Sequence, residues 1–84
     1  EENVVFVGRK PPMAYVQAMM NTFGRGDTVV LKARGRSIST AVDAAEIIRR
    51  IMDVKVKDVH IDTVVLGDDK RNVSMIDITV TKGG

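Results

Sequence analysis

Two short apolar runs separated by a segment of helical periodicity constrain the fold of this chain most strongly. Asn3–Val7 and Thr28–Arg34 are rich in β-branched residues, which favour buried strands. Pro11 and Pro12 follow the first run and suit the start of a helix that continues to about Phe23. The apolar residues of that helix fall on one face: Val16, Met19, Met20 and Phe23. Because a helix that connects two strands crosses over the sheet, we expect the strands to be adjacent and parallel.

The residues that follow the second run predict a second helix. Gly35 interrupts the strand, and the hydroxyl of Ser37 or Ser39 can cap a helix that continues to about Met52. The apolar face of this helix is broad and consists of Ile38, Ala41, Val42, Ala44, Ala45, Ile47, Ile48 and Ile51. A face of this width indicates contact on two sides, with the sheet and with a further partner such as a second subunit.

The last third of the chain predicts an antiparallel pair of strands. Val54–Leu66 alternates polar and apolar residues, and the alternation changes phase at Lys57-Asp58, which indicates a β-bulge. The turn-forming residues 67–72 connect this strand to a fourth, Val73–Thr81. The element order is therefore βαβαββ. It predicts an α+β two-layer sandwich in which both helices cover one face of the sheet.

Composition excludes several classes of protein. With 84 residues, of which 44% are hydrophobic and 29% charged, the chain predicts one small globular domain, residues 1–84. It contains no cysteine, which excludes disulfides, thiol catalysis and cysteine metal sites. No apolar run reaches the ~20 residues that span a bilayer, so we expect no membrane partner and a cytoplasmic location. A domain of this size has a thin core and gains stability from a partner subunit.

The charge of the chain is unevenly distributed. The formal net charge is only +2, but between Gly8 and Arg36 six basic residues stand against one acid, Asp27. Most of these basic residues lie just after the first strand, or along the second strand and into the turn after it, and would share one edge of the sheet: Arg9, Lys10, Lys32, Arg34 and Arg36. Alternation along an extended segment places Lys32, Arg34 and, if the segment continues, Arg36 on one side. This patch suits the phosphate oxygens of a nucleic acid, and the alternative is a solvated rim without a ligand.

Two parts of the chain carry a resemblance to a known family. One is Asn3–Val16, and the other is Lys32–Ser39 followed by Ala41–Asp43 and Glu46-Ile47. Together they resemble the Alba family of archaeal chromatin proteins, also called Sac10b. The resemblance implies a βαβαββ fold similar to the C-terminal domain of translation initiation factor three. It also implies a non-enzymatic homodimer that binds double-stranded DNA, and often RNA, with little sequence preference. Such a protein compacts or organises archaeal DNA, which implies association with the chromosome, or nucleoid, in the cytoplasm.

The resemblance also implies roles for individual residues. Arg9 and Lys10 match the family's basic pair in the loop after the first strand, which contacts the nucleic-acid backbone. A lysine in that loop can be acetylated in Alba proteins, so Lys10 is the residue that an acetylase and a deacetylase would regulate. Lys32, Arg34 and Arg36 match the family's second group of contacts.

Two further contacts are implied by the resemblance. In the family, the hairpin between the last two strands is an arm that reaches along a minor groove, and Lys70 and Arg71 lie at its tip here. Met52 lies near a position where many members carry an aromatic residue that packs one dimer against the next. Methionine packs in such places too, so Met52 is expected to contribute to higher-order assembly on DNA.

The residues also leave three alternatives to a DNA-binding chromatin protein. The same basic surface suits an RNA-binding protein that acts in RNA processing or stabilisation, and a chain that binds no polynucleotide would be a dimerisation module. A metal-dependent enzyme could use Asp58, His60 and Asp62 as ligands of a metal ion. These residues also fit the polar face of an amphipathic strand, and a straight strand would hold their side chains far apart. No nucleophile–base pair or cofactor motif is evident in the sequence, so we expect no catalysis, no metal and no cofactor.

Overall fold

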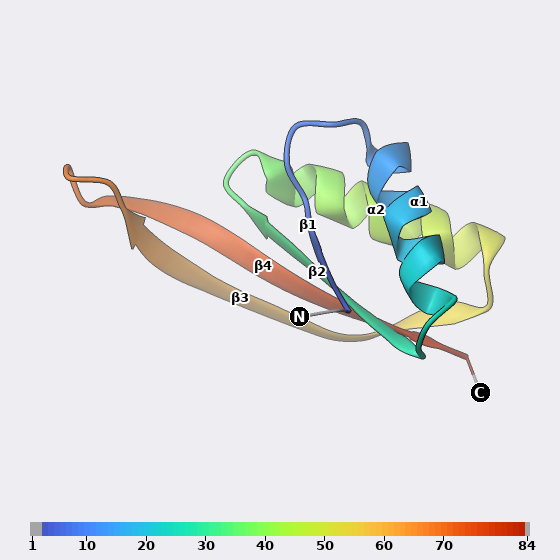
Figure 1. Ribbon diagram of the computed structural model, residues 1–84. Helices are drawn as coiled ribbons and strands as arrows, with labels where there is room; N and C mark the ends of the chain where they lie inside the picture. The colour runs from blue at the N-terminus through green and yellow to red at the C-terminus, as the bar shows by residue number, and fades with distance from the viewer. Residues whose placement is uncertain (1–2, 84) are drawn as a thin grey trace.

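Two helices cover one face of a four-stranded sheet, and a long hairpin extends beyond them (Figure 1). This computed structural model describes residues 3–83, so residues 1, 2 and 84 of the predicted domain lie outside the described part. The predicted βαβαββ order and the two-layer sandwich are confirmed. The elements are β1 (Val4–Phe6), α1 (Pro12–Phe23), β2 (Thr28–Arg34), α2 (Ser37–Ile51), β3 (Val54–Leu66) and β4 (Arg71–Lys82).

The strands lie in the order β1-β2-β4-β3. β1 and β2 are parallel, as the helical crossover predicted, and β4 is antiparallel to both of its neighbours. The register between β3 and β4 shifts between Val56 and Asp58, which confirms the predicted bulge. Because the bulge adds one residue to β3, Val59 and Ile61 stay on the same face of the sheet as Val56 although their spacing changes.

The core lies between the two helices and one face of the sheet. Alternate residues of β2 are buried, so this strand is covered on one side only, and the other side forms part of an open face. Three of the four buried residues of α2 are alanines: Ala41, Ala44 and Ala45. The residues with no exposed surface are Val16, Met19, Val29, Leu31, Ala41, Ala44, Ile48 and Val80.

Two residues predicted to lie in the core are exposed. Met20 is 44% exposed, and Val42 is 41% exposed. The buried arc of α1 is centred on Met19 and includes Tyr15 and Thr22, so Met20 falls beyond its edge, about 100° further around the helix. Val42 lies beyond the edge of the buried arc of α2 in the same way. Both helical faces are therefore rotated from the predicted ones.

Two predictions at the ends of elements are wrong. α2 begins at Ser37, and no side chain of residues 3–83 caps it; the Ser37 hydroxyl donates to the Gly8 carbonyl oxygen instead. The β3–β4 turn is also shorter than predicted. Gly67 and Lys70 both adopt left-handed backbone conformations, with φ of 80° and 53°, and close it early. Arg71 therefore belongs to β4 rather than to the turn.

Candidate nucleic-acid interface

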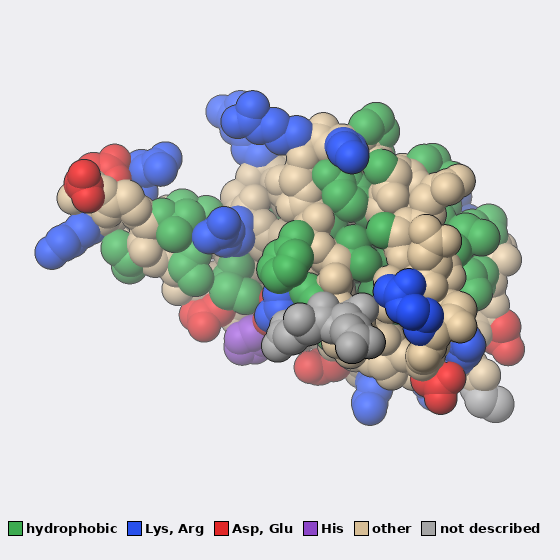
Figure 2. Space-filling model, viewed as in Figure 1, with side chains coloured by type: hydrophobic (Ala, Val, Ile, Leu, Met, Phe, Trp, Pro, Cys, Tyr) green, Lys and Arg blue, Asp and Glu red, His purple; other side chains and the backbone are tan. Residues whose placement is uncertain are grey.

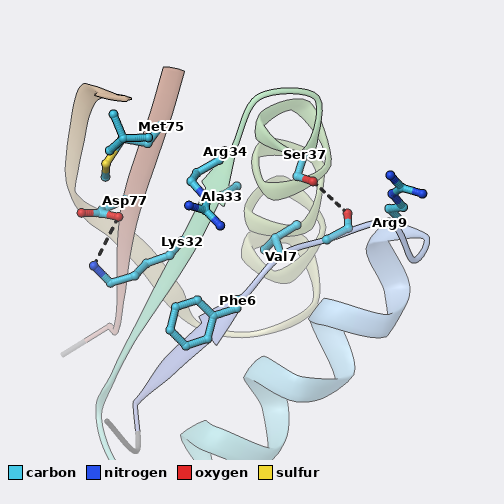
Figure 3. Close-up of a pocket in the computed structure, with 11 residues that line it drawn as sticks. Phe6, Val7, Arg9, Lys32, Ala33, Arg34, Ser37, Met75 and Asp77 are labelled. Carbon is cyan, nitrogen blue, oxygen red and sulfur yellow. Dashed lines mark hydrogen bonds and ion pairs between the residues drawn. The ribbon is translucent and has the colours of Figure 1, made fainter. Parts of the chain in front are cut away.

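The parallel pairing of β1 and β2 brings two basic segments to one edge of the molecule. Both strands end on the same side of the sheet, where the loop after β1 meets the turn after β2. The Ser37 hydroxyl donates a hydrogen bond of 3.1 Å to the Gly8 carbonyl oxygen and so ties α2 to this loop (Figure 3). Lys and Arg side chains gather over these loops at the upper edge of Figure 2. We call the exposed residues of this cluster the basic edge: Arg9, Lys10, Arg34 and Arg36.

Tyr15 holds the loop that carries Arg9 and Lys10. Its hydroxyl oxygen accepts hydrogen bonds from the backbone N–H groups of Gly8, at 2.8 Å, and Lys10, at 3.0 Å. Tyr15 itself is buried on α1, which begins immediately after the loop with Pro12 in its first turn. The Tyr15 hydroxyl therefore fixes the backbone of the loop from the side of the core, while the side chains of Arg9 and Lys10 project into solvent.

Lys32 is less available to a ligand than the residues of the basic edge. It lies opposite Asp77 of β4, and its Nζ is 3.5 Å from Asp77 Oδ1. That oxygen is buried and accepts no hydrogen bond from residues 3–83, so the two groups interact through their charges. Arg34 shares the face of Lys32 but Arg36 does not, because Gly35 turns the chain with a φ of 57° before Arg36. The predicted row of three basic residues is therefore a pair on β2 and a third residue beyond it.

A shallow depression of about 610 Å³ lies on the open face of the sheet beside the basic edge (Figure 3). Its lining includes Phe6, Arg9, Lys32, Arg34, Met75 and Asp77. The Phe6 side chain is 73% exposed, although its run of apolar residues predicted a buried strand. Val5 and Val7 are buried, so the alternation of a strand that is covered on one face accounts for the exposure of Phe6.

The β3–β4 hairpin carries the remaining predicted contacts away from the body of the molecule. Basic and acidic side chains lie together at its tip, on the left of Figure 2. Arg71 Nε is 3.3 Å from Asp69 Oδ2, and both side chains are exposed. Lys70 lies in the turn itself. The acidic residue before Lys70 therefore offsets part of the charge of Arg71.

The three polar residues predicted to alternate on β3 do share the open face of the sheet. Asp58, His60 and Asp62 pair with alternate residues of β4, and His60 lies opposite Asp77. His60 Nε2 is 3.9 Å from Asp62 Oδ2, and both side chains are exposed. No group of three residues suited to hold a metal ion occurs between positions 3 and 83. The geometry gives the metal alternative no support and shows an acidic row along the far side of the open face.

An apolar surface on the helix side of the sheet was not predicted from β3. Val59 and Ile61 lie opposite Ile78 and Ile76 of the core, yet they are 52% and 72% exposed. Ile61 and Ile38 of α2 line one depression, and Val42 lies one turn further along α2. In the sequence, the broad apolar face of α2 was the feature that indicated such a surface. We call Val42, Val59 and Ile61 the apolar edge.

Comparison with known proteins decides the family. The sequence pattern of the Alba family matches residues 3–63. The chain belongs to the Alba family. A relative from Picrophilus torridus, "DNA/RNA-binding protein Alba", is 48% identical, with 98% of each chain covered. "DNA/RNA-binding protein Alba 1" from Archaeoglobus fulgidus is 50% identical, with 96% of this chain and 97% of the relative covered.

Solved structures of Alba proteins have the same fold. Alba from Thermoplasma volcanium superimposes with a TM-score of 0.88 at 44% identity, covering 95% of this chain and all of the other. ALBA1 from Trypanosoma brucei superimposes with a TM-score of 0.86 at 29% identity, covering 99% of this chain and 71% of the other. The family pattern ends at residue 63, so Lys70 and Arg71 lie outside it but inside the range that the relatives cover.

The Alba resemblance placed a contact between dimers at Met52, and the structure shows how that region is built. Met52 ends α2 and packs partly buried against the core. Its neighbour Ile51 is 54% exposed on the last turn of the helix. An apolar contact in this region would therefore involve Ile51 more than Met52.

Among the helices of residues 3–83, none has the length and apolar character that crossing a membrane requires.

Proposed function

We propose that this Alba-family protein binds double-stranded DNA and RNA and has no catalytic activity. The names of its relatives from Picrophilus torridus and Archaeoglobus fulgidus describe DNA/RNA-binding proteins. The observation that carries the proposal to this chain is the basic edge, where the loop after β1, tied to α2 by the Ser37–Gly8 hydrogen bond, and the end of β2 with its turn expose four cationic side chains.

The ligand of the basic edge is the phosphate backbone. Arginine and lysine side chains on neighbouring loops neutralise phosphates and release their counterions, whatever the base sequence. Arg9 and Arg34 supply planar guanidinium groups that can bind phosphate oxygens in pairs. Lys32 contributes less than these residues because Asp77 lies 3.5 Å from its Nζ. Binding is therefore strong at low salt, weak at high salt and nearly independent of sequence.

The protein acts as a homodimer that joins two copies through the apolar edge. Val59 and Ile61 expose apolar surface on the helix side of β3, and Val42 extends this surface onto α2. Such surface is stabilised when it is buried against a second copy. The dimer presents two basic edges to one nucleic acid, which raises the number of phosphates neutralised.

The hairpin adds contacts at some distance from the basic edge. Lys70 and Arg71 lie at the end of a hairpin in a molecule that measures 44 × 22 × 20 Å. An exposed arginine at such a tip favours a narrow minor groove, where the electrostatic potential is most negative. The ion pair of Arg71 with Asp69 lowers the contribution of each arm.

Binding of this kind organises the chromosome and is open to regulation. Many dimers on one DNA molecule neutralise its charge and compact it, and contact between dimers near Ile51 and Met52 favours assembly along the DNA.

The Lys10 side chain is exposed in the loop held by Tyr15, where an acetylase can reach it. Acetylation removes one positive charge from the basic edge and weakens binding, and a deacetylase restores it.

The salt dependence of binding tests this proposal. For the wild-type dimer on a blunt DNA duplex, a plot of log K against log salt should have a slope of roughly −5 to −9, as about six to ten neutralised phosphates require. Replacing Arg34 and Arg36 with alanine should make the slope less steep by about 1 for each phosphate that is no longer neutralised. Arg25→Ala is the matched control, because Arg25 precedes β2 at the opposite end of the sheet. A wild-type slope near zero contradicts the proposal.

Competition separates the two kinds of nucleic acid. Duplex DNA and duplex RNA of equal length are titrated against each other at one salt concentration, with fluorescence anisotropy as the readout. A protein that acts on phosphates alone should bind both within a small factor. A large preference for RNA would make RNA processing or stabilisation the main role.

A further inference from the structure

Phe6 is the exposed aromatic residue of this molecule. The chain has one tyrosine and two phenylalanines, and Tyr15 and Phe23 are buried in the core. The Phe6 ring projects from β1 on the open face of the sheet with 73% of its surface exposed. The flat face of such a ring is apolar and polarisable, and it binds other planar rings by stacking.

The surroundings of Phe6 combine apolar and cationic groups. By register, Phe6 lies beside Lys32 of β2, and Met75 of β4 adds apolar surface to the same depression. Arg34 lines this depression at the end of β2, above the ring in Figure 3, and Arg9 lies further away on the loop after β1. The volume of about 610 Å³ is within the usual range for sites that hold one small organic ligand.

This combination matches the two halves of a nucleotide. A base can stack on the Phe6 ring, while the phosphate attached to it binds the guanidinium group of Arg34. A base in an intact duplex cannot reach the ring, because its faces are stacked and its edges are paired. The ligand must therefore carry an unpaired base, as at an overhang, a bulge or a loop.

The acidic row on β3 limits how far a strand can extend across the open face. Asp58 and Asp62 lie on this face at the edge of the sheet, and Asp77 lies between them and Phe6. Carboxylates repel phosphates, so a single strand cannot cross the sheet from β1 to β3. The backbone stays at the basic edge, and the site holds one base rather than a run of bases.

We propose that the Phe6 site binds one unpaired nucleobase of a nucleic acid whose backbone lies on the basic edge. The site rests on the proposed function, because the basic edge delivers the strand to it. It is independent of the apolar edge, since Val59 and Ile61 lie on the opposite face of the sheet. The protein would thus prefer duplexes with unpaired nucleotides over fully paired ones.

Three probes of the same duplex test this site: a blunt duplex, one with a short single-stranded overhang, and one whose overhang is abasic. Wild type should bind the overhang more tightly than the abasic overhang by about fivefold to 100-fold, the usual effect of one stacked base. A 2-aminopurine in the overhang should be quenched on binding. Phe6→Ala should remove both effects and leave binding of the blunt duplex unchanged.

Controls separate stacking from other effects. Phe6→Trp should keep the preference for the overhang, because it restores an aromatic face. Met20→Ala removes another exposed apolar side chain, on α1, and should behave as wild type. Equal affinity of wild type for the three probes, or an unchanged preference in Phe6→Ala, would overturn the base site alone. Failure of wild type to bind any of the probes would overturn the proposed function as well.

Discussion

At the scale of single residues, Tyr15 connects the core to the candidate interface. Its ring is part of the buried face of α1, and its hydroxyl accepts the backbone N–H groups of Gly8 and Lys10. A loop held in this way loses little conformational freedom when it binds a ligand, so its side chains are ready for phosphates. A residue of the core thus contributes to the geometry of the basic edge by holding the backbone of its loop.

Tyr15→Phe should weaken both folding and binding. The change leaves two backbone donors without their acceptor, so the free energy of unfolding should fall by about 1–2 kcal/mol in urea titrations. Amide hydrogen exchange at Gly8 and Lys10 should accelerate, and affinity for duplex DNA should fall several-fold. Thr22→Val is the matched control, because it removes a hydrogen bond to Ala18 from the same helix but far from the loop. Unchanged exchange at both amides would contradict this role for Tyr15.

At the scale of elements, strand pairing decides which basic residues contribute to the positive electrostatic potential of the open face. Lys32 and Arg34 are two residues apart on β2 and share the open face, yet their surroundings differ. β4 places Asp77 beside Lys32 and Met75 beside Arg34. Arg34 therefore lies beside a neutral side chain, while the carboxylate of Asp77 offsets part of the charge of Lys32.

Asp77→Asn should strengthen the binding of duplex DNA. The substitution removes the carboxylate 3.5 Å from Lys32 Nζ and leaves a polar side chain of nearly the same shape. One more cation then becomes available to each copy, so the salt slope should steepen by about 1 per copy. Salt titrations of wild type and variant measure this change, and Asp62→Asn, which removes an acid further from Lys32, is the control. Weaker binding by Asp77→Asn would contradict this prediction and would show that the Lys32–Asp77 ion pair mainly stabilises the fold.

At the scale of the whole molecule, two separate regions of the surface differ in what they expose. The end of the β1–β2 pair carries the basic edge, and the outer strand β3 carries the apolar edge on its helix side. This separation lets a second copy cover the apolar edge without covering the cationic side chains. It also leaves the open face, with Phe6, accessible.

Ile61→Asp should convert the dimer into a monomer. Ile61 is 72% exposed, so the substitution should be tolerated by the fold of one chain, but a carboxylate in an apolar interface is costly. Sedimentation equilibrium measures the mass, and duplex binding should weaken with a salt slope about half as steep. Met20→Asp, at an exposed apolar position on α1, should leave the mass unchanged. A dimeric Ile61→Asp variant would contradict the proposed interface.

Sequence patterns predicted the elements well and the exposure of side chains less well. The order of elements, the parallel β1–β2 pair and the bulge near Lys57 follow from local spacing and from the crossover rule, and the structure confirms them. Met20 and Val42 were placed in the core because periodicity identifies an apolar stripe but not the edges of the buried arc. The cap expected from Ser37 or Ser39 was wrong, because the helix begins at Ser37 itself and the hydroxyl of that residue donates to the distant Gly8 carbonyl oxygen.

The fold class, the family and the excess of basic residues near the first two strands can all be predicted from residue order alone. These depend on residue types a few positions apart and on the topology that they impose. The position of Lys32 opposite Asp77 and the exposure of Phe6 and Ile61 became evident only from the packing of the elements. Each of these depends on which strands pair and on how far the helices extend over the sheet. Such relations join residues distant in the chain, and no local period encodes them.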